Sequence, residues 1–357
     1  MGMQHKFDCL ALFSGGLDSI LACKLMQAQG INVLGLHFTS PFFGHPDKMQ
    51  HWQDVYQIPL LPVDISQEYI DLLMHGPDWG LGKYLNPCVD CKILMLKKIK
   101  HRLAEFDANW IISGEVLGQR PMSQRRDTLN RIPKQAGVSD ILLRPLCAKL
   151  LPATPMENSG LVNREGLLDL AGRSRKRQLE LADKFDIQEI PTPGGGCLLT
   201  DPQTSKRFFY VLRHLQAPGK NDFELCNIGR QFWYNSHWLV VGRNSQDNTH
   251  LLEMVQHRDL VFKPAHIPGP VAVGRQLLQN WDNDIIEKAA RFILKFTPKA
   301  KKEKEPVSFL IGNQGENTEI SISPDSEVPD IWEEPSESAF QEEKKHFWNQ
   351  QPQEEDF

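Results

Sequence analysis

Two hydrophobic periodicities alternate along the first two hundred residues. Short, nearly continuous apolar runs at 9–14, 31–38, 60–65 and 109–115 predict buried strands. Between and after them, apolar residues recur every three or four positions, which predicts helices at 17–30, 91–106 and 173–185. Strands that alternate with helices indicate a parallel sheet covered by helices. We therefore expect an α/β, Rossmann-like domain over residues 1–202.

The pattern changes after about residue 205. Residues 208–215 predict a helix, residues 223–243 show the aromatic-rich alternation of antiparallel strands, and residues 275–296 are again helical. These elements predict a second, smaller α+β domain over residues 203–300.

The last segment differs in composition. Residues 301–357 contain five Lys against fifteen Asp and Glu, a net charge of −10, and are rich in Ser, Pro and Glu. Such a composition favours disorder. We expect residues 301–357 to be an acidic, mostly disordered tail that contributes little to stability.

Charge is uneven in the rest of the chain as well. The whole sequence of 357 residues has a formal charge of −5, yet residues 92–177 hold seventeen Lys and Arg against eight Asp and Glu. A basic belt of this kind suits a polyanion, although many surface lysines are simply solvated. No apolar run is long enough to span a membrane, and the first residues resemble a strand, not a signal peptide. We expect a cytoplasmic protein.

The clearest motif is FSGGLDSIL, which follows the first predicted strand and begins the first predicted helix. A glycine turn between a strand and a helix N-terminus presents backbone N–H groups to phosphate. Ser14 and Ser19 can donate to phosphate oxygens, and Asp18 suits a Mg²⁺ ion at the pyrophosphate. The alternative is a glycine turn with a serine cap. The loop has no Walker-type lysine, which argues against kinase-like phosphoryl transfer.

These motifs resemble known enzymes. SGGLDS (14–19) resembles the signature of the PP-loop ATP pyrophosphatases, which cleave ATP to AMP and pyrophosphate and have the adenine nucleotide α-hydrolase fold. Residues 112–124 resemble the tRNA 4-thiouridine synthetases, and NPCVDC (86–91) and GGGC (194–197) resemble the tRNA 2-thiouridylases. The resemblance implies catalysis by Cys91, Cys197 and Asp18. It also implies ATP binding by Ser14, Gly15, Gly16, Leu17, Asp18, Ser19, His37, Phe38, Gly114 and Glu115.

Three of the seven cysteines lie in these motifs. Cys88 and Cys91 enter a basic helix, where the helix N-terminus and Lys92 are expected to lower their pKa values. If the glycine run brings Cys197 to them, the three can ligate a 4Fe–4S cluster that leaves one iron open for sulfide. Alternatively, Cys197 carries a persulfide that Cys91 resolves. Zinc lacks a clear fourth ligand, and Cys197 beside a turn can also be structural.

The second domain resembles the NFACT-type RNA-binding domain over residues 240–273. Arg243, Asn244 and Asn248 match that family's Gly-Arg-Asn segment, and the resemblance implies that they bind RNA. Val261 and Lys263 depart from the family pattern. Arg125 and Arg126 of the basic belt are further candidate RNA contacts. The alternative is a β-rich domain used for packing or dimerisation.

Together these features predict an ATP-dependent tRNA sulfurtransferase that adenylates a uridine carbonyl and replaces its oxygen with sulfur. The expected cofactors are ATP, Mg²⁺ and a 4Fe–4S cluster. The expected partners are tRNA and a sulfur donor, either sulfide or a persulfide-carrying protein, and the sequence is compatible with a homodimer. Two alternatives use the same motifs: an adenylating enzyme with another substrate, and an RNA-binding factor with a regulatory nucleotide site.

Overall fold

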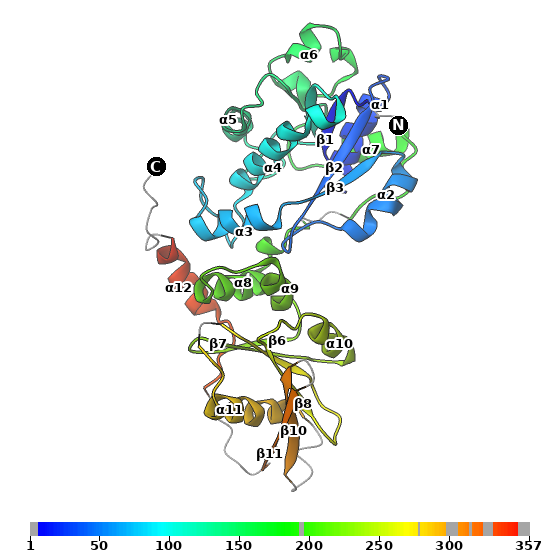
Figure 1. The fold of residues 1–357 in the computed structure, drawn as a ribbon. Helices are drawn as coiled ribbons and strands as arrows, with labels where there is room; N and C mark the ends of the chain where they lie inside the picture. The colour runs from blue at the N-terminus through cyan, green and yellow to red at the C-terminus, as the bar shows by residue number, and fades with distance from the viewer. Residues whose placement is uncertain are drawn as a thin grey trace. The chain divides into compact units, whose positions relative to one another are not determined.

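The computed structural model describes residues 6–192, 196–277, 279–297, 306–313, 316–323 and 331–348. The chain forms two compact units, Met1–Thr200 and Asp201–Phe357 (Figure 1). Within the described part of the chain, no helix is both long enough and apolar enough to cross a membrane. The cytoplasmic location stays a prediction.

Unit 1 is built on a five-stranded parallel sheet with the strand order β3-β2-β1-β4-β5. Its strands are β1 (Cys9–Leu12), β2 (Val33–Thr39), β3 (Leu60–Asp64), β4 (Trp110–Ser113) and β5 (Leu142–Leu143). Its helices are α1 (Leu17–Gln27), α2 (Met49–Tyr56), α3 (Ser66–His75), α4 (Cys88–Arg102), α5 (Arg126–Ala136), α6 (Pro155–Asn158) and α7 (Lys176–Lys184).

The middle of this sheet carries the functional loops. β1 is buried along its whole length and pairs with β2 on one side and β4 on the other. Helix α1 packs with α7, α4 packs with α5, and both α1 and α4 contact β1. In an open parallel sheet, ligands bind outside the carboxyl ends of the strands where the strand order reverses. Here that point lies between β1 and β4, which confirms the predicted α/β class.

Unit 2 contains a six-stranded antiparallel sheet with the order β11-β10-β8-β9-β7-β6. Its strands are β6 (Arg230–Tyr234), β7 (His237–Val241), β8 (Leu260–Pro264), β9 (Ala272–Arg275), β10 (Val307–Asn313) and β11 (Glu316–Ile322). Its helices are α8 (Pro202–His214), α9 (Lys220–Cys226), α10 (Ser245–Glu253), α11 (Asn283–Ile293) and α12 (Glu337–Phe347) (Figure 1).

The prediction of a mostly disordered tail is wrong for the described residues beyond 305. β10 pairs with β8 and β11, and Val307, Phe309 and Ile311 alternate into the core of unit 2. Phe340 of α12 is fully buried against Phe209 of α8. The segment is acidic overall, but a few apolar residues are spaced as a strand requires. The amino-acid composition of the segment does not record this spacing, so composition alone predicts disorder.

Candidate functional site

The loop after β1 has the backbone geometry that its glycines predict. Gly15 adopts φ +76°, and a Cβ there would lie 2.4 Å from the Trp52 ring, so a larger residue does not fit. Ser19 Oγ donates to the Gly16 carbonyl at 2.7 Å, and Ser14 N–H donates to Ser19 Oγ at 3.3 Å. Gly16 caps α1 without a side-chain hydrogen bond. The loop therefore brings two hydroxyl groups to a helix N-terminus that has no side-chain cap.

Asp18 of this loop is held by a chain of amides that sequence reasoning missed. Gln119 Nε2 donates to Asp18 Oδ2 at 2.7 Å, and the buried Gln178 of α7 donates to Gln119 Oε1 at 3.2 Å. Asp18 Oδ1 is buried and has no hydrogen-bond partner among the described residues. Burial raises the pKa of Asp18, while hydrogen bonding to Gln119 and Gln178 and the charges of Arg175 and Arg120 oppose the rise.

The unpartnered Asp18 oxygen fits a Mg²⁺ ion. Mg²⁺ in nucleotide sites is commonly held by one or two carboxylates together with phosphate oxygens and water. A buried carboxylate oxygen with no partner costs free energy until such a ligand is present.

The end of β4 meets the same loop. A Cβ on Gly114 would lie 2.4 Å from the Asp18 carbonyl oxygen, so only glycine allows β4 to approach α1 this closely. Next to it, the buried Glu115 accepts from Arg144 Nε at 2.8 Å and from Ser113 Oγ at 2.9 Å. Burial alone would raise the pKa of Glu115, but the charges of Arg144 and Lys92 outweigh it, and the pKa lies below its usual value.

His37 and Phe38 lie near the carboxyl end of β2, and both are buried. His37 Nδ1 contacts the Phe13 carbonyl at 3.0 Å, and His45 N–H donates to His37 Nε2 at 2.8 Å. Nε2 is therefore the acceptor, Nδ1 carries the proton, and the ring is neutral. Burial lowers the pKa of His37, in agreement with this state. An ATP contact through either nitrogen would require breaking one of these bonds.

The structure brings the three motif cysteines within electrostatic range of one another. Burial and the charges of Cys91 and Cys88 raise the pKa of Cys197 to about 12. Gly194 and Gly195 lie outside the described residues, but Leu198 N–H donates to the Phe42 carbonyl at 2.8 Å, which fixes the chain just after Cys197. Asn86 Nδ2 donates to Cys88 Sγ at 3.1 Å, and the buried Tyr69 hydrogen-bonds Cys91.

The expected lowering of the cysteine pKa values is wrong for Cys91. Burial raises its pKa to about 11, and the Tyr69 hydrogen bond and the charge of Lys92 only partly offset that rise. Desolvation of a thiolate outweighs the helix terminus and a single lysine.

Across the described residues, no group of three or more His, Cys, Asp and Glu side chains is arranged to hold a metal ion. Cys9, Cys23, Cys147 and Cys226 are buried in the cores, as the sequence predicts.

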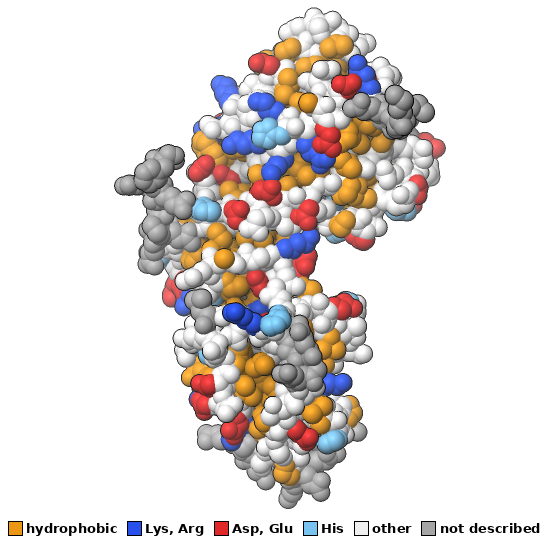
Figure 2. Space-filling view, in the orientation of Figure 1, with side chains coloured by type: hydrophobic (Ala, Val, Ile, Leu, Met, Phe, Trp, Pro, Cys, Tyr) orange, Lys and Arg blue, Asp and Glu red, His pale blue; other side chains and the backbone are white. Residues whose placement is uncertain are grey.

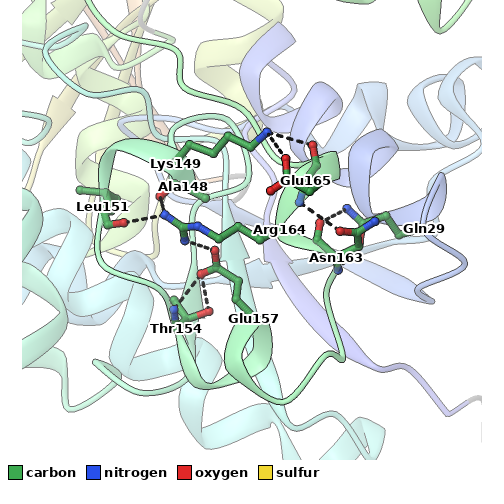
Figure 3. A network of polar contacts seen from close by, with 9 residues as sticks. All are labelled: Gln29, Ala148, Lys149, Leu151, Thr154, Glu157, Asn163, Arg164 and Glu165. Carbon is green, nitrogen blue, oxygen red and sulfur yellow. Dashed lines mark hydrogen bonds and ion pairs between the residues drawn. The ribbon is translucent and has the colours of Figure 1, made fainter.

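Many cations of the basic belt serve local structure. Arg164 donates to the carbonyls of Ala148 and Leu151 and pairs with the capping carboxylate Glu157, while Lys149 donates to the Glu165 carbonyl (Figure 3). On the face of unit 1 drawn in Figure 2, basic and acidic side chains are interspersed. The charge count alone therefore overstates the basic surface that is free to meet a polyanion.

The candidate RNA residues differ in how far they are engaged. Arg125 is exposed, and its Nε lies 3.4 Å from Asp127 Oδ1. Arg126 Nη1 donates to the Leu150 carbonyl at 3.2 Å.

In unit 2, Arg243 pairs with Asp247 through both Nε and Nη2, at 2.6 and 3.1 Å. Asn244 caps α10 by accepting from Asp247 N–H at 2.9 Å, and Asn248 accepts from Val271 N–H at 3.0 Å. The three motif residues of unit 2 therefore make hydrogen bonds that hold the loop before α10 and the N-terminus of that helix in place.

Comparisons with known proteins fit this two-part organisation. Residues 4–149 match the family of the thiamine biosynthesis protein (ThiI), and residues 229–331 match the NFACT protein RNA binding domain. A probable tRNA sulfurtransferase of Thermococcus kodakarensis is 25% identical over 54% of this chain and 46% of its own length. The tRNA-specific 2-thiouridylase MnmA of Exiguobacterium sibiricum is 24% identical over 70% of this chain and 71% of its own length.

This chain thus spans about half the length of the first relative. A solved structure, a predicted tRNA methyltransferase subunit from Methanocaldococcus jannaschii, covers 39% of this chain and 68% of its own at 14% identity and TM-score 0.29, too weak a likeness to carry an argument. The family matches agree with the geometry of the loop after β1 and with the separate antiparallel unit. Residues 4–149 are thus similar to the ThiI family, and residues 229–331 are similar to the NFACT protein RNA binding domain.

Proposed function

We propose that this protein thiolates a uridine in tRNA at the expense of ATP. The observation that best supports this proposal is the packing of the nucleotide loop and the end of β4 at one end of the parallel sheet. Gly114 packs against the Asp18 backbone in the nucleotide loop, and the next residue, Glu115, is close enough to Lys92, the neighbour of Cys91, to be affected by its charge. A base bound there would lie between bound ATP and a sulfur-bearing cysteine. The sulfurtransferase and thiouridylase relatives support this assignment.

In the first step, a uracil carbonyl oxygen attacks the α-phosphate of ATP and pyrophosphate leaves. Ser14, Ser19 and the backbone N–H groups of the loop would bind the phosphates. Asp18, with its free Oδ1, would hold Mg²⁺, which neutralises charge on the leaving pyrophosphate. The Gln178–Gln119 chain would keep Asp18 in that orientation.

In the second step, we propose the persulfide relay, with the 4Fe–4S cluster and its open iron as the alternative. A persulfide on Cys197, loaded by an external persulfide donor, attacks the activated carbon and expels AMP. The Cys91 thiolate then attacks the Cys197 sulfur, which releases the thiolated base and leaves a Cys91–Cys197 disulfide. An external thiol must reduce that disulfide after each turnover. The electrostatic coupling of the two sulfurs supports their proximity.

The test is mass spectrometry of tRNA nucleosides from cells with and without this gene. Loss of one thiolated uridine, restored by the wild-type gene and not by Cys197→Ala, is the expected result. Cys226→Ala, a buried cysteine of unit 2, is the control and should restore the nucleoside. Unchanged nucleosides would favour adenylation of another substrate or a regulatory nucleotide site.

Iron and acid-labile sulfide analysis of anaerobically purified protein separates the relay from the 4Fe–4S cluster. The relay predicts an iron-free protein in which Cys91 and Cys197 are required. Iron bound in proportion to protein, and lost on Cys88→Ala, would replace the relay with the cluster.

A further inference from the structure

Arg102, Arg144 and Arg243 each donate to a carboxylate through Nε, but Arg144 does so differently from the other two. Arg102 also donates through Nη2 to the second oxygen of Glu105, with both distances at 2.8 Å. Arg243 does the same with Asp247. Arg144 donates from Nε to Glu115 Oε2 at 2.8 Å, but the second bond is not made. Arg144 Nη2 and Glu115 Oε1 are both buried without a hydrogen-bond partner among the described residues.

We call an arginine–carboxylate pair that makes only one of its two possible hydrogen bonds an open fork. In a buried pair, an open fork is the opposite of what stability alone favours. A buried ion pair is tolerated when its remaining donors and acceptors are satisfied, and each buried polar atom left over is costly. The Arg102–Glu105 and Arg243–Asp247 pairs each make both hydrogen bonds. The pair that is 7% and 2% exposed keeps one donor and one acceptor unused.

The surroundings hold this arrangement in place. Ser113 Oγ donates to the same Glu115 oxygen that Arg144 binds, and Cys147 Sγ donates to the Glu115 carbonyl at 3.2 Å. The preceding residue, Gly114, packs against the nucleotide loop. Lys92, which follows Cys91 in the sequence, is close enough for its charge to lower the pKa of Glu115. The open fork therefore lies at the point where the strand order reverses, beside both parts of the candidate site.

We infer that the open fork of Glu115 and Arg144 binds the imide edge of the target uracil. The base N3–H would donate to Glu115 Oε1, and the adjacent carbonyl oxygen would accept from Arg144 Nη2. Both unsatisfied atoms are then used, and a planar base matches a planar guanidinium–carboxylate pair. The inference rests on the proposed function and adds to it the residues that select the base.

The experiment uses three nucleotides in equilibrium binding to the full chain saturated with a non-hydrolysable ATP analogue. Uridine 5′-monophosphate should bind in the millimolar range or tighter. Its 3-methyl derivative lacks the N3–H donor and should bind roughly tenfold more weakly. Its 5-methyl derivative carries the same extra methyl group on another edge and should bind like the parent.

Arg144→Lys tests the fork itself, because lysine keeps the charge beside Glu115 but lacks the planar second donor. This variant loses the donor to the base carbonyl oxygen and should bind uridine monophosphate roughly tenfold more weakly than the wild-type chain, with unchanged affinity for the ATP analogue. Arg102→Lys makes the same replacement in a closed surface fork and should change neither. Circular dichroism and thermal melting verify that both variants fold.

Several results would overturn the inference. These are no detectable uridine monophosphate binding by the wild-type chain, equal binding of the 3-methyl and parent nucleotides, or an Arg144→Lys variant that binds uridine monophosphate as tightly as the wild-type chain. Loss of ATP-analogue affinity in Arg144→Lys, with uridine monophosphate affinity intact, would assign the fork to adenine. Since the readout is binding, it can succeed or fail independently of the tRNA nucleoside analysis that tests the proposed function.

Discussion

The two units use their sequence motifs in opposite ways. In unit 1, motif residues keep buried polar atoms unused at the end of the parallel sheet: Asp18 Oδ1 and Glu115 Oε1. In unit 2, the motif residues Asn244 and Asn248 bind backbone N–H groups of their own domain, and Arg243 closes a fork with Asp247. A family motif can therefore mark a candidate ligand site or a structural requirement. Buried polar atoms without a partner indicate the first, and polar atoms that bind their own domain indicate the second.

The largest expected effect is on Asp18. Asp18→Ala should lower the rate of AMP and pyrophosphate formation from ATP by about 10²- to 10³-fold, because it removes the one carboxylate in the nucleotide loop. Separation of AMP and ADP by ion-exchange chromatography measures it, with the exposed Asp54→Ala on α2 as the control. Production of ADP in place of AMP would remove the PP-loop assignment.

The next effect concerns the strand that composition assigned to a disordered tail. Phe309 is fully buried in β10, so Phe309→Ala should lower the free energy of unfolding of unit 2 by about 3–5 kcal/mol. Urea titration followed by tryptophan fluorescence measures it. Ser321→Ala on the exposed side of β11 should change it by less than about 0.5 kcal/mol. If the two variants had equal free energies of unfolding, β10 would not contribute to the stability of unit 2.

A smaller effect is expected from His214, which stacks on Trp233 with ring centroids 4.7 Å apart. Burial and the charge of Arg213 lower the pKa of His214 to about 4. Its unfolded value is about 6.5, so the protonated form favours unfolding. Its contribution is complete above pH 6.5 and is lost as the pH falls toward 4, by about 2 kcal/mol between pH 7 and 5.

Unfolding titrations at several pH values test this. His214→Phe keeps an aromatic ring against Trp233 and should reduce the loss of stability between pH 7 and 5, while the exposed His250→Gln should leave it unchanged. The same pH dependence in wild type and His214→Phe would place the titrating group elsewhere.

The smallest effect separates a cap from an RNA contact. Asn244→Ala should cost about 1 kcal/mol of stability because it removes the cap of α10, whereas Asn244→Ser should retain most of it. We expect Asn244→Ser to bind bulk tRNA as tightly as wild type in a filter-binding assay at fixed salt. Weaker tRNA binding by this stable variant would show that the motif in unit 2 also reads RNA.

The sequence predicted the parts of the site that are local. Ser14 to Ser19 could be placed at a helix N-terminus because strand, glycines and helix follow one another, and Glu115 because it follows a buried strand. Gln119 stands in the same motif as Glu115, but its partner Asp18 is 101 residues away and nothing local reveals the bond. The burial that raises the pKa of Cys91 likewise arises from packing, which a helix-terminus argument does not include. The strand at Val307 pairs with β8, more than forty residues earlier, and its short alternation is hidden among acidic residues.

His37 also bears on how related sequences should be interpreted. Its ring spans from the end of β1 to the loop at His45, with a donor on one edge and an acceptor on the other. Asparagine and glutamine carry a donor and an acceptor, but both lie at the tip of one amide group and point away on the same side. Position 37 should therefore tolerate very few replacements in a mutational scan. A histidine retained there across relatives would resemble a catalytic base in an alignment, while its constraint comes from joining two pieces of backbone.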